Sequence, residues 1–138
     1  MRIFIDTSAY AKRFVEESGS EEIDSIILQG TELGLSIICV PELLSAMNRK
    51  LREKAISRPQ YSQIKSRLSE EIHDIDVIQL TDVVIKKTIM LLEKKNFLRT
   101  LDAIHIACAI EWEADIFLTS DKRQIKAARN EIKKVKLI

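Results

Sequence analysis

The chain has 138 residues, the length of one ordinary domain, and 46% of them are hydrophobic, which is enough for a packed core. A net charge of +1 gives no sign of a polyanion partner, and two isolated cysteines argue against a zinc site or a disulfide framework. The longest uncharged apolar stretch, residues 33–41, is too short to span a bilayer, and the acid at position 6 precedes any signal-peptide core. We therefore expect one cytoplasmic domain without a membrane segment.

Strands and helices are predicted to alternate along the chain. Short apolar runs rich in β-branched and aromatic residues predict strands, at residues 2–5, 33–38, 76–80, 116–119 and 135–138. Cap residues followed by periodic apolar positions predict helices, which begin near residues 7, 20, 41, 57, 81, 101 and 120. Because such alternation implies a parallel sheet covered on both faces, the expected fold is an α/β three-layer sandwich with a mostly parallel sheet of about four to five strands.

Four acidic residues lie where a strand or loop gives way to a helix. They are Asp6, Glu42, Asp102 and Asp121. The carboxyl ends of parallel strands meet at one edge of a sheet, so acids that follow strands can converge there. Asp102 begins a mostly apolar helix, so its carboxylate is expected near the core, where it needs a partner. Four clustered carboxylates repel one another, and a hard cation such as Mg²⁺ or Mn²⁺ among them would relieve that repulsion.

Each acid also has a simpler explanation. Asp6 and Asp121 could be helix caps, because aspartate is a preferred residue at that position. Glu42 and Asp102 could be first-turn acids that interact favourably with a helix dipole. Taken one at a time, none of the four therefore identifies a functional site.

Hydroxyl groups beside the first and last of these acids favour the interpretation as a site. Thr7 and Ser8 follow the first acid, and Thr119 and Ser120 precede the last. Such groups orient carboxylates around bound metals. Ser120 is also the expected cap of the last helix.

His105 lies three residues after Asp102, so the two side chains share a face of the predicted helix. The imidazole could assist proton transfer or contact a substrate. The alternative, which the sequence favours, is a semi-buried histidine hydrogen-bonded to a neighbouring side chain.

With these motifs the chain resembles a known family. The segments Ile-Asp-Thr-Ser, Pro-Glu-Leu, Leu-Asp-Ala-Ile-His-Ile-Ala and Leu-Thr-Ser-Asp look like the successive motifs of PIN-domain nucleases. The length and the motif order are most similar to the VapC-type toxins of prokaryotic toxin–antitoxin pairs. The resemblance covers essentially the whole chain and implies a single PIN-like domain over residues 1–138.

The resemblance implies an endoribonuclease that hydrolyses RNA phosphodiester bonds with Mg²⁺ or Mn²⁺ and serves as the toxin of a type II toxin–antitoxin pair. Divalent ions would activate water and offset the charge that builds on the attacking and leaving oxygens. By motif match the four acids take the family's acidic positions. Asp6 and Asp102 are expected to contact the metal, and Glu42 and Asp121 to complete the shell or to hold metal-bound waters. The family also implies a homodimer and a small antitoxin. The antitoxin would sit in a groove on residues 42–75; the alternative is that the apolar side chains of this region are ordinary core residues.

Other classes fit less well. Phosphatases that form an aspartyl phosphate need a second acid two residues after the first, where this chain has Ser8. A dinucleotide-binding protein needs a Gly-x-Gly-x-x-Gly turn, which the sequence lacks. The alternative that remains is a non-catalytic RNA-binding or scaffolding protein with the same fold.

Overall fold

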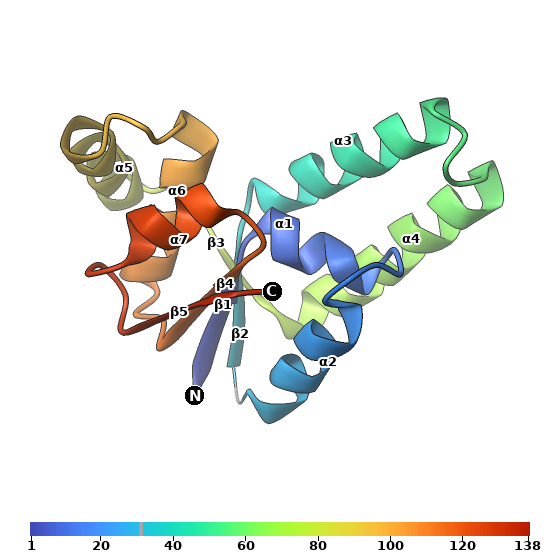
Figure 1. The fold of residues 1–138 in the computed structure, drawn as a ribbon, viewed down its shortest axis with the longest axis horizontal. Helices are drawn as coiled ribbons and strands as arrows, with labels where there is room; N and C mark the ends of the chain where they lie inside the picture. The colour runs from blue at the N-terminus through green and yellow to red at the C-terminus, as the bar shows by residue number, and fades with distance from the viewer. Residues whose placement is uncertain (31) are drawn as a thin grey trace.

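A five-stranded sheet forms the centre of the computed structural model, which describes residues 1–30 and 32–138 (Figure 1). The strand order is β3-β2-β1-β4-β5, and each neighbouring pair is parallel. The strands are β1 (Arg2–Ile5), β2 (Glu32–Ser36), β3 (Asp76–Ile78), β4 (Ile116–Thr119) and β5 (Lys134–Leu137). The predicted α/β fold with a parallel sheet is confirmed.

Helices cover both faces of this sheet (Figure 1). They are α1 (Thr7–Tyr10), the 3₁₀ turn η1 (Ala11–Arg13), α2 (Ser20–Gln29), α3 (Cys39–Arg52), α4 (Arg58–Glu71), the 3₁₀ turn η2 (Ile72–Asp74), α5 (Asp82–Lys94), α6 (Thr100–Glu111) and α7 (Lys122–Ala128). Alternate side chains of β1 face opposite layers: Phe4 packs with α5, α6 and α7, whereas Ile3 and Ile5 pack with α1 to α4. Because both faces are buried, the strand is apolar from Ile3 to Ile5.

Local sequence signals set several helix ends. Ser57 and Gln60 form a capping box, in which the Ser57 hydroxyl accepts the Gln60 N–H at 3.2 Å and the Gln60 side chain accepts the Ser57 N–H at 2.7 Å. The Thr81 hydroxyl accepts the Val84 N–H in the same way at the start of α5. Within the two described ranges, no helix has the length and hydropathy needed to cross a membrane.

Two predicted helix starts are wrong in detail. Helix α3 begins at Cys39, so Pro41 occupies its third position; the missing N–H is still harmless there, because the first four N–H groups of a helix have no intrahelical acceptor. Helix α7 is capped by Asp121, whose carboxylate accepts the Arg123 N–H at 2.8 Å, and not by Ser120. These differences shift the helix starts by one or two residues and leave the order of elements unchanged.

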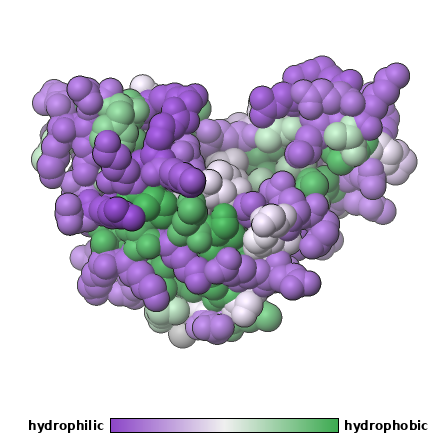
Figure 2. Space-filling model, viewed as in Figure 1, coloured by the Kyte–Doolittle hydropathy of each residue, from purple (hydrophilic) through white to green (hydrophobic). Residues whose placement is uncertain are grey.

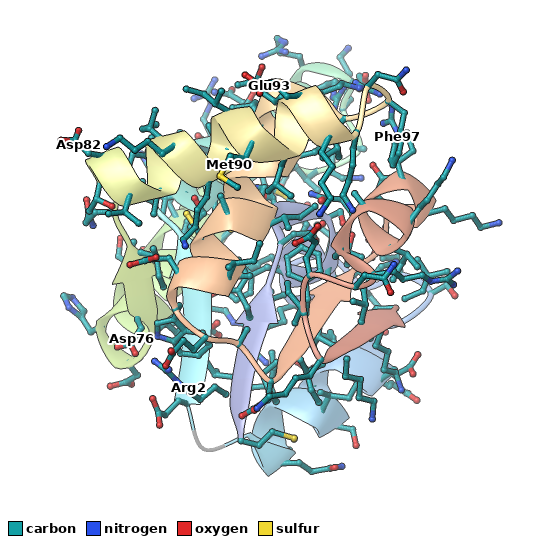
Figure 3. The ribbon with its side chains drawn as sticks, turned by 90° about the vertical axis from the view of Figure 1, so that its left-hand side faces the viewer. Arg2, Asp76, Asp82, Met90, Glu93 and Phe97 are labelled. Atoms are coloured by element: carbon teal, nitrogen blue, oxygen red, sulfur yellow. The ribbon has the colours of Figure 1, made fainter. Side chains whose placement is uncertain are left out.

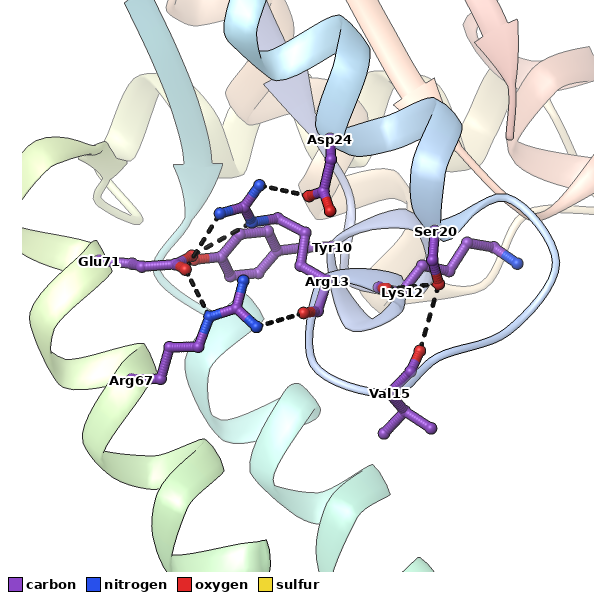
Figure 4. A network of polar contacts seen from close by, with 8 residues as sticks. All are labelled: Tyr10, Lys12, Arg13, Val15, Ser20, Asp24, Arg67 and Glu71. Atoms are coloured by element: carbon purple, nitrogen blue, oxygen red, sulfur yellow. Dashed lines mark hydrogen bonds and ion pairs between the residues drawn. The ribbon is translucent and has the colours of Figure 1, made fainter.

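A cluster of charged side chains, which we call the Arg13 clasp, fastens α4 to the N-terminal helices (Figure 4). It consists of Tyr10, Arg13, Asp24, Arg67 and Glu71. The Arg13 guanidinium binds both oxygens of Glu71, at 3.0 and 3.2 Å, and Asp24 at 2.6 Å. Glu71 also accepts from Arg67 at 2.7 Å and from the Tyr10 hydroxyl at 3.1 Å. One half-buried carboxylate therefore ties together segments that lie far apart in the sequence.

Glu71→Gln is expected to lower the free energy of unfolding at pH 7 by about 2 kcal/mol, the usual contribution of hydrogen bonds to a charged group. Burial alone would raise the pKa of Glu71, but Arg13 and Arg67 hold it below its ordinary value of 4.5. Because the folded-state pKa is the lower one, the stabilisation is present at neutral pH and is lost as the pH falls from about 4.5 through the folded-state pKa.

Chemical denaturation of parent and variant between pH 3 and pH 8 measures this effect. The two curves should converge at the acidic end. Glu70→Gln, on an exposed neighbour in the same helix, is the matched control and should change stability by less than about 0.5 kcal/mol. A constant difference between parent and Glu71→Gln at all pH values would contradict the role given to the carboxylate charge.

Candidate active site

The strand order reverses between β1 and β4. From β1 the chain proceeds outward through β2 and β3 on one side, and from β4 it proceeds to β5 on the other. In parallel sheets of this kind, ligands bind in the crevice at the carboxyl ends of the strands next to the reversal. Asp6 directly follows β1 and Thr119 ends β4, so both lie at this position.

Asp6 is a buried carboxylate, 3% exposed, with both oxygens hydrogen-bonded. Oδ1 accepts from the Ser8 hydroxyl at 2.7 Å and from the Ala9 N–H at 3.0 Å, and Oδ2 accepts from the Thr119 hydroxyl at 2.5 Å. Burial raises the pKa of Asp6, and the nearby His105 and these hydrogen bonds offset only part of that rise. The carboxylate is thus held in one orientation at a desolvation cost that a cation would reduce.

The Ser8 hydroxyl connects the carboxyl ends of the two central strands. Its oxygen lies 3.3 Å from Thr119 Oγ1 and accepts the backbone N–H of Ser120 at 2.9 Å. Two of the predicted supporting side chains, Ser8 and Thr119, therefore contact Asp6. Ser120 contributes through its N–H, while its hydroxyl reaches only the Ser8 carbonyl at 3.4 Å.

Glu42 lies in the first turn of α3 and meets side chains from two other helices. Its Oε1 accepts from the Thr7 hydroxyl at 2.7 Å and lies 2.6 Å from His105 Nε2; Thr7 Oγ1 and His105 Nε2 are 3.2 Å apart. An ionised carboxylate only accepts, so Nε2 carries the proton. Burial alone would raise the pKa of Glu42, but His105 and Thr7 lower it below its ordinary value.

Asp102, in the first turn of α6, faces a carboxylate of like charge. Burial raises its pKa, and the nearby Asp121 raises it further. Arg123, Arg99 and His105 act in the opposite direction without restoring the ordinary value. Asp121 itself caps α7 and has an ion pair with Arg123 at 3.4 Å. The two carboxylates therefore repel each other, and the positive charges of Arg123 and Arg99 offset this repulsion only in part.

One imidazole lies within electrostatic reach of three of the four acids. His105 lowers the pKa of Asp6, of Glu42 and of Asp102, and Asp121 acts on Asp102. In the part of the chain that the structure describes, however, no three His, Cys, Asp or Glu side chains are grouped closely enough to hold a metal ion. As oxygen donors the four carboxylates fit a hard divalent cation, but a shared ion requires side chains to turn toward it.

Sequence reasoning missed Arg123 as a neighbour of the site. It follows Asp121 by two residues, and its charge reaches both Asp121 and Asp102. Its position in the basic run at residues 122–136 was the available signal, but a run of this kind usually marks a solvated face.

The sequence profile of the PIN domain family matches residues 3–130. A comparison with curated proteins finds no match. Among solved structures, VapBC2 from Rickettsia felis bound to a DNA fragment from its promoter is similar, with a TM-score of 0.72 at 16% identity, covering 100% of this chain and 99% of that chain. VapC20 from Mycobacterium tuberculosis, described as a sarcin-ricin loop cleaving toxin, has a TM-score of 0.71 at 16% identity, covering 91% and 94%.

FitAcB from Neisseria gonorrhoeae is similar over 97% of this chain and 96% of that chain, with a TM-score of 0.71 at 18% identity. At these identities the structural likeness shows a shared fold and nothing further. Membership of the family is shown by the profile match, which spans nearly the whole chain and includes most of β1 and all of β4. The chain belongs to the PIN domain family.

Proposed function

We propose that the protein is a metal-dependent endoribonuclease and the toxin component of a type II toxin–antitoxin pair. The observation that carries the proposal is Asp6 held by Ser8 and Thr119 at the strand reversal of a PIN-domain chain. His105 lies within electrostatic reach of Asp6, Glu42 and Asp102, and Asp121 acts on Asp102. The mutual repulsion of Asp102 and Asp121 and the desolvation of Asp6 cost stability. A bound divalent cation would recover that cost, which is the arrangement expected of a functional site.

Asp6, Glu42, Asp102 and Asp121 would hold the ion, which we take to be Mg²⁺ or Mn²⁺. When bound, such an ion supplies a nucleophile at neutral pH and offsets charge on the phosphodiester. The protein's own part is to fix the carboxylates: the hydroxyls of Ser8 and Thr119 hold Asp6, as described above. Asp6 is therefore already oriented before the substrate arrives, so this carboxylate needs little reorganisation during the reaction.

The shape of the molecule supports a strand of RNA as substrate. In space-filling view the surface is hollowed between the lobe formed by α5, α6 and α7 and the arm formed by α3 and α4 (Figures 1 and 2). Glu42 lies at the base of the arm, and Asp102 lies on the opposite lobe. Arg99 and Arg123 stand next to Asp102, where they can contact phosphates that flank the scissile bond. The cell's RNA lies in the cytoplasm, which is where such an enzyme would act.

A small antitoxin is the proposed protein partner. A toxin–antitoxin complex from Klebsiella pneumoniae has the same fold, with a TM-score of 0.68 at 14% identity and 89% of each chain covered, which supports a partner of this kind here. This chain has a groove of about 460 Å³ between the segment after η1 and the α3–α4 arm. Phe14, Val15, Ile56 and Ile64 line it together with Arg67. The apolar face of an amphipathic segment would match such a lining.

A second copy of the chain is the proposed partner of α5. Apolar side chains on the outside of this helix are exposed: Val83 and Ile89 by 48%, Ile85 by 39% and Met90 by 67%. Met90 projects from the outer face of the helix in Figure 3. Exposed apolar side chains gathered on one element, rather than scattered singly, favour an interface.

Cleavage of RNA should require a divalent cation. The purified protein would be incubated with several single-stranded and structured RNAs in Mg²⁺, in Mn²⁺ and in excess chelator, with gel analysis of the products. Cleavage in either metal and none in chelator is expected. Equal cleavage in chelator would contradict the metal mechanism, and RNA binding without cleavage under all conditions would favour the non-catalytic alternative.

Asp102→Asn should lower cleavage by at least about 100-fold, because the change removes a metal-binding charge while keeping the side chain's shape. It should also raise the melting temperature of the metal-free protein, since the repulsion from Asp121 disappears. Asp6→Asn should abolish cleavage in the same way. Calorimetry in chelator and the RNA assay measure the two effects, with Asp74→Asn at an exposed position as control. A folded, fully active Asp102→Asn protein would refute the assignment.

The double variant Ile89→Glu with Met90→Glu is expected to be monomeric under conditions in which the parent forms a homodimer, because two charges would be placed in the apolar contact. Light scattering coupled to size-exclusion chromatography gives the masses. Leu28→Glu is the matched control, since Leu28 is 85% exposed on α2, and it should leave the dimer intact. A parent that stays monomeric at high concentration would contradict the proposed interface.

A further inference from the structure

His105 and Asp6 are the most deeply buried ionisable side chains among the predicted site residues, and the surroundings of His105 restrict what it does. It is 2% exposed on α6, whereas Glu42 and Thr7 come from α3 and α1. Helix α6 packs on one face of the sheet, and α1 and α3 pack on the other. The hydrogen bonds among these three side chains therefore join the two helical layers beyond the carboxyl edge of the sheet.

Packing alone does not account for an imidazole at this position. Its Nδ1 is buried and lacks a hydrogen-bond partner among the described residues. A buried polar atom without a partner is destabilising, and an aliphatic side chain of similar size would avoid the cost. The polar contacts that His105 does make are those of Nε2, at 2.6 Å from Glu42 Oε1 and 3.2 Å from Thr7 Oγ1. The feature that requires histidine is thus the N–H donated to Glu42.

Both donors converge on the same oxygen of Glu42. Thr7 and His105 bind Oε1, while no hydrogen bond joins Oε2 to any residue within 1–30 or 32–138. The Glu42 side chain is 28% exposed, so the second oxygen is accessible from outside the core. Two donors on one oxygen fix the carboxylate plane and leave the other oxygen available as a ligand.

We propose that His105 is a positioning residue, which together with Thr7 clamps Glu42 through Oε1 and presents Oε2 to a divalent cation. The inference rests on the proposed metal-dependent function and specifies how the chain orients one of its acids. His105 acts through Glu42 and makes no contact with the substrate or the ion. This role depends on an N–H donated from the position of Nε2. A side chain that only filled the space would not need that donor, so variants with and without it distinguish the two roles.

A matched pair of variants isolates that N–H. His105→Gln keeps a donor near the position of Nε2, whereas His105→Leu has a similar size and no donor. Binding of Mn²⁺ is measured by isothermal calorimetry and by the rise in melting temperature with metal concentration. We expect His105→Leu to weaken Mn²⁺ binding by roughly 10-fold or more, the usual effect of losing a group that orients a ligand, and His105→Gln to stay within about 3-fold of the parent.

Kinetics give a second measurement in the RNA assay. The loss in His105→Leu should appear as a higher Mn²⁺ requirement, with most of kcat recovered at saturating metal. Thr7→Val removes the other donor with little change in shape and should weaken Mn²⁺ binding in the same direction, so the clamp is tested even if a His105 variant fails to fold. His73→Leu, at the other, exposed histidine, is the control and should bind Mn²⁺ as the parent does.

Unchanged Mn²⁺ binding in both His105→Leu and Thr7→Val would overturn the inference while leaving the proposed function intact. Equal losses in the Gln and Leu variants would also overturn it, because the donated N–H would then be irrelevant. A parent that neither binds Mn²⁺ nor cleaves RNA would refute the proposed function and the clamp together.

Discussion

The register between β1 and β4 is the constraint on which the site depends. Ile5 pairs with Leu118 in this register, so the residues that follow them, Asp6 and Thr119, lie opposite each other at the end of the pairing. The Asp6 N–H donates to the Leu118 carbonyl at 3.0 Å and so extends the pairing by one hydrogen bond. The Thr119 hydroxyl then donates to the Asp6 carboxylate, and the Ser8 hydroxyl contacts both Asp6 and Thr119. A one-residue slip would turn these side chains toward the other face and separate the groups.

The acids are arranged at a cost to stability. Asp6 and Asp102 both have raised pKa values because they are buried, and Asp102 also faces Asp121. A sequence selected for stability alone would not retain such a cluster, since burying a charge without full compensation destabilises a fold. Away from the site, both faces of the sheet are packed with aliphatic and aromatic side chains. The cost of burying these acids therefore lies where a cation would reduce it.

The N-terminal segment connects the site with the groove proposed for the antitoxin. Thr7, at the start of α1, binds Glu42, and Tyr10 and Arg13 a few residues later join the Arg13 clasp on α4. Phe14, the residue after Arg13, lines the groove. A stretch of eight residues, Thr7 to Phe14, therefore contacts both places.

The sequence by itself determined the order of elements, the parallel sheet and the four acids, because apolar runs, capping residues and motif spacing are local signals. The buried run Ile3-Phe4-Ile5 and the capping box at Ser57 are examples. Only the tertiary structure decided which side chains meet. That His105 donates to Glu42, 63 positions away in the chain, follows from the placement of α6 and α3 on opposite faces of the sheet, where side chains from both layers meet beyond its carboxyl edge, and no local pattern encodes it. The same holds for Arg123 beside Asp102 and for Arg13 bound to Glu71, since long-range ion pairs depend on how the layers pack against each other.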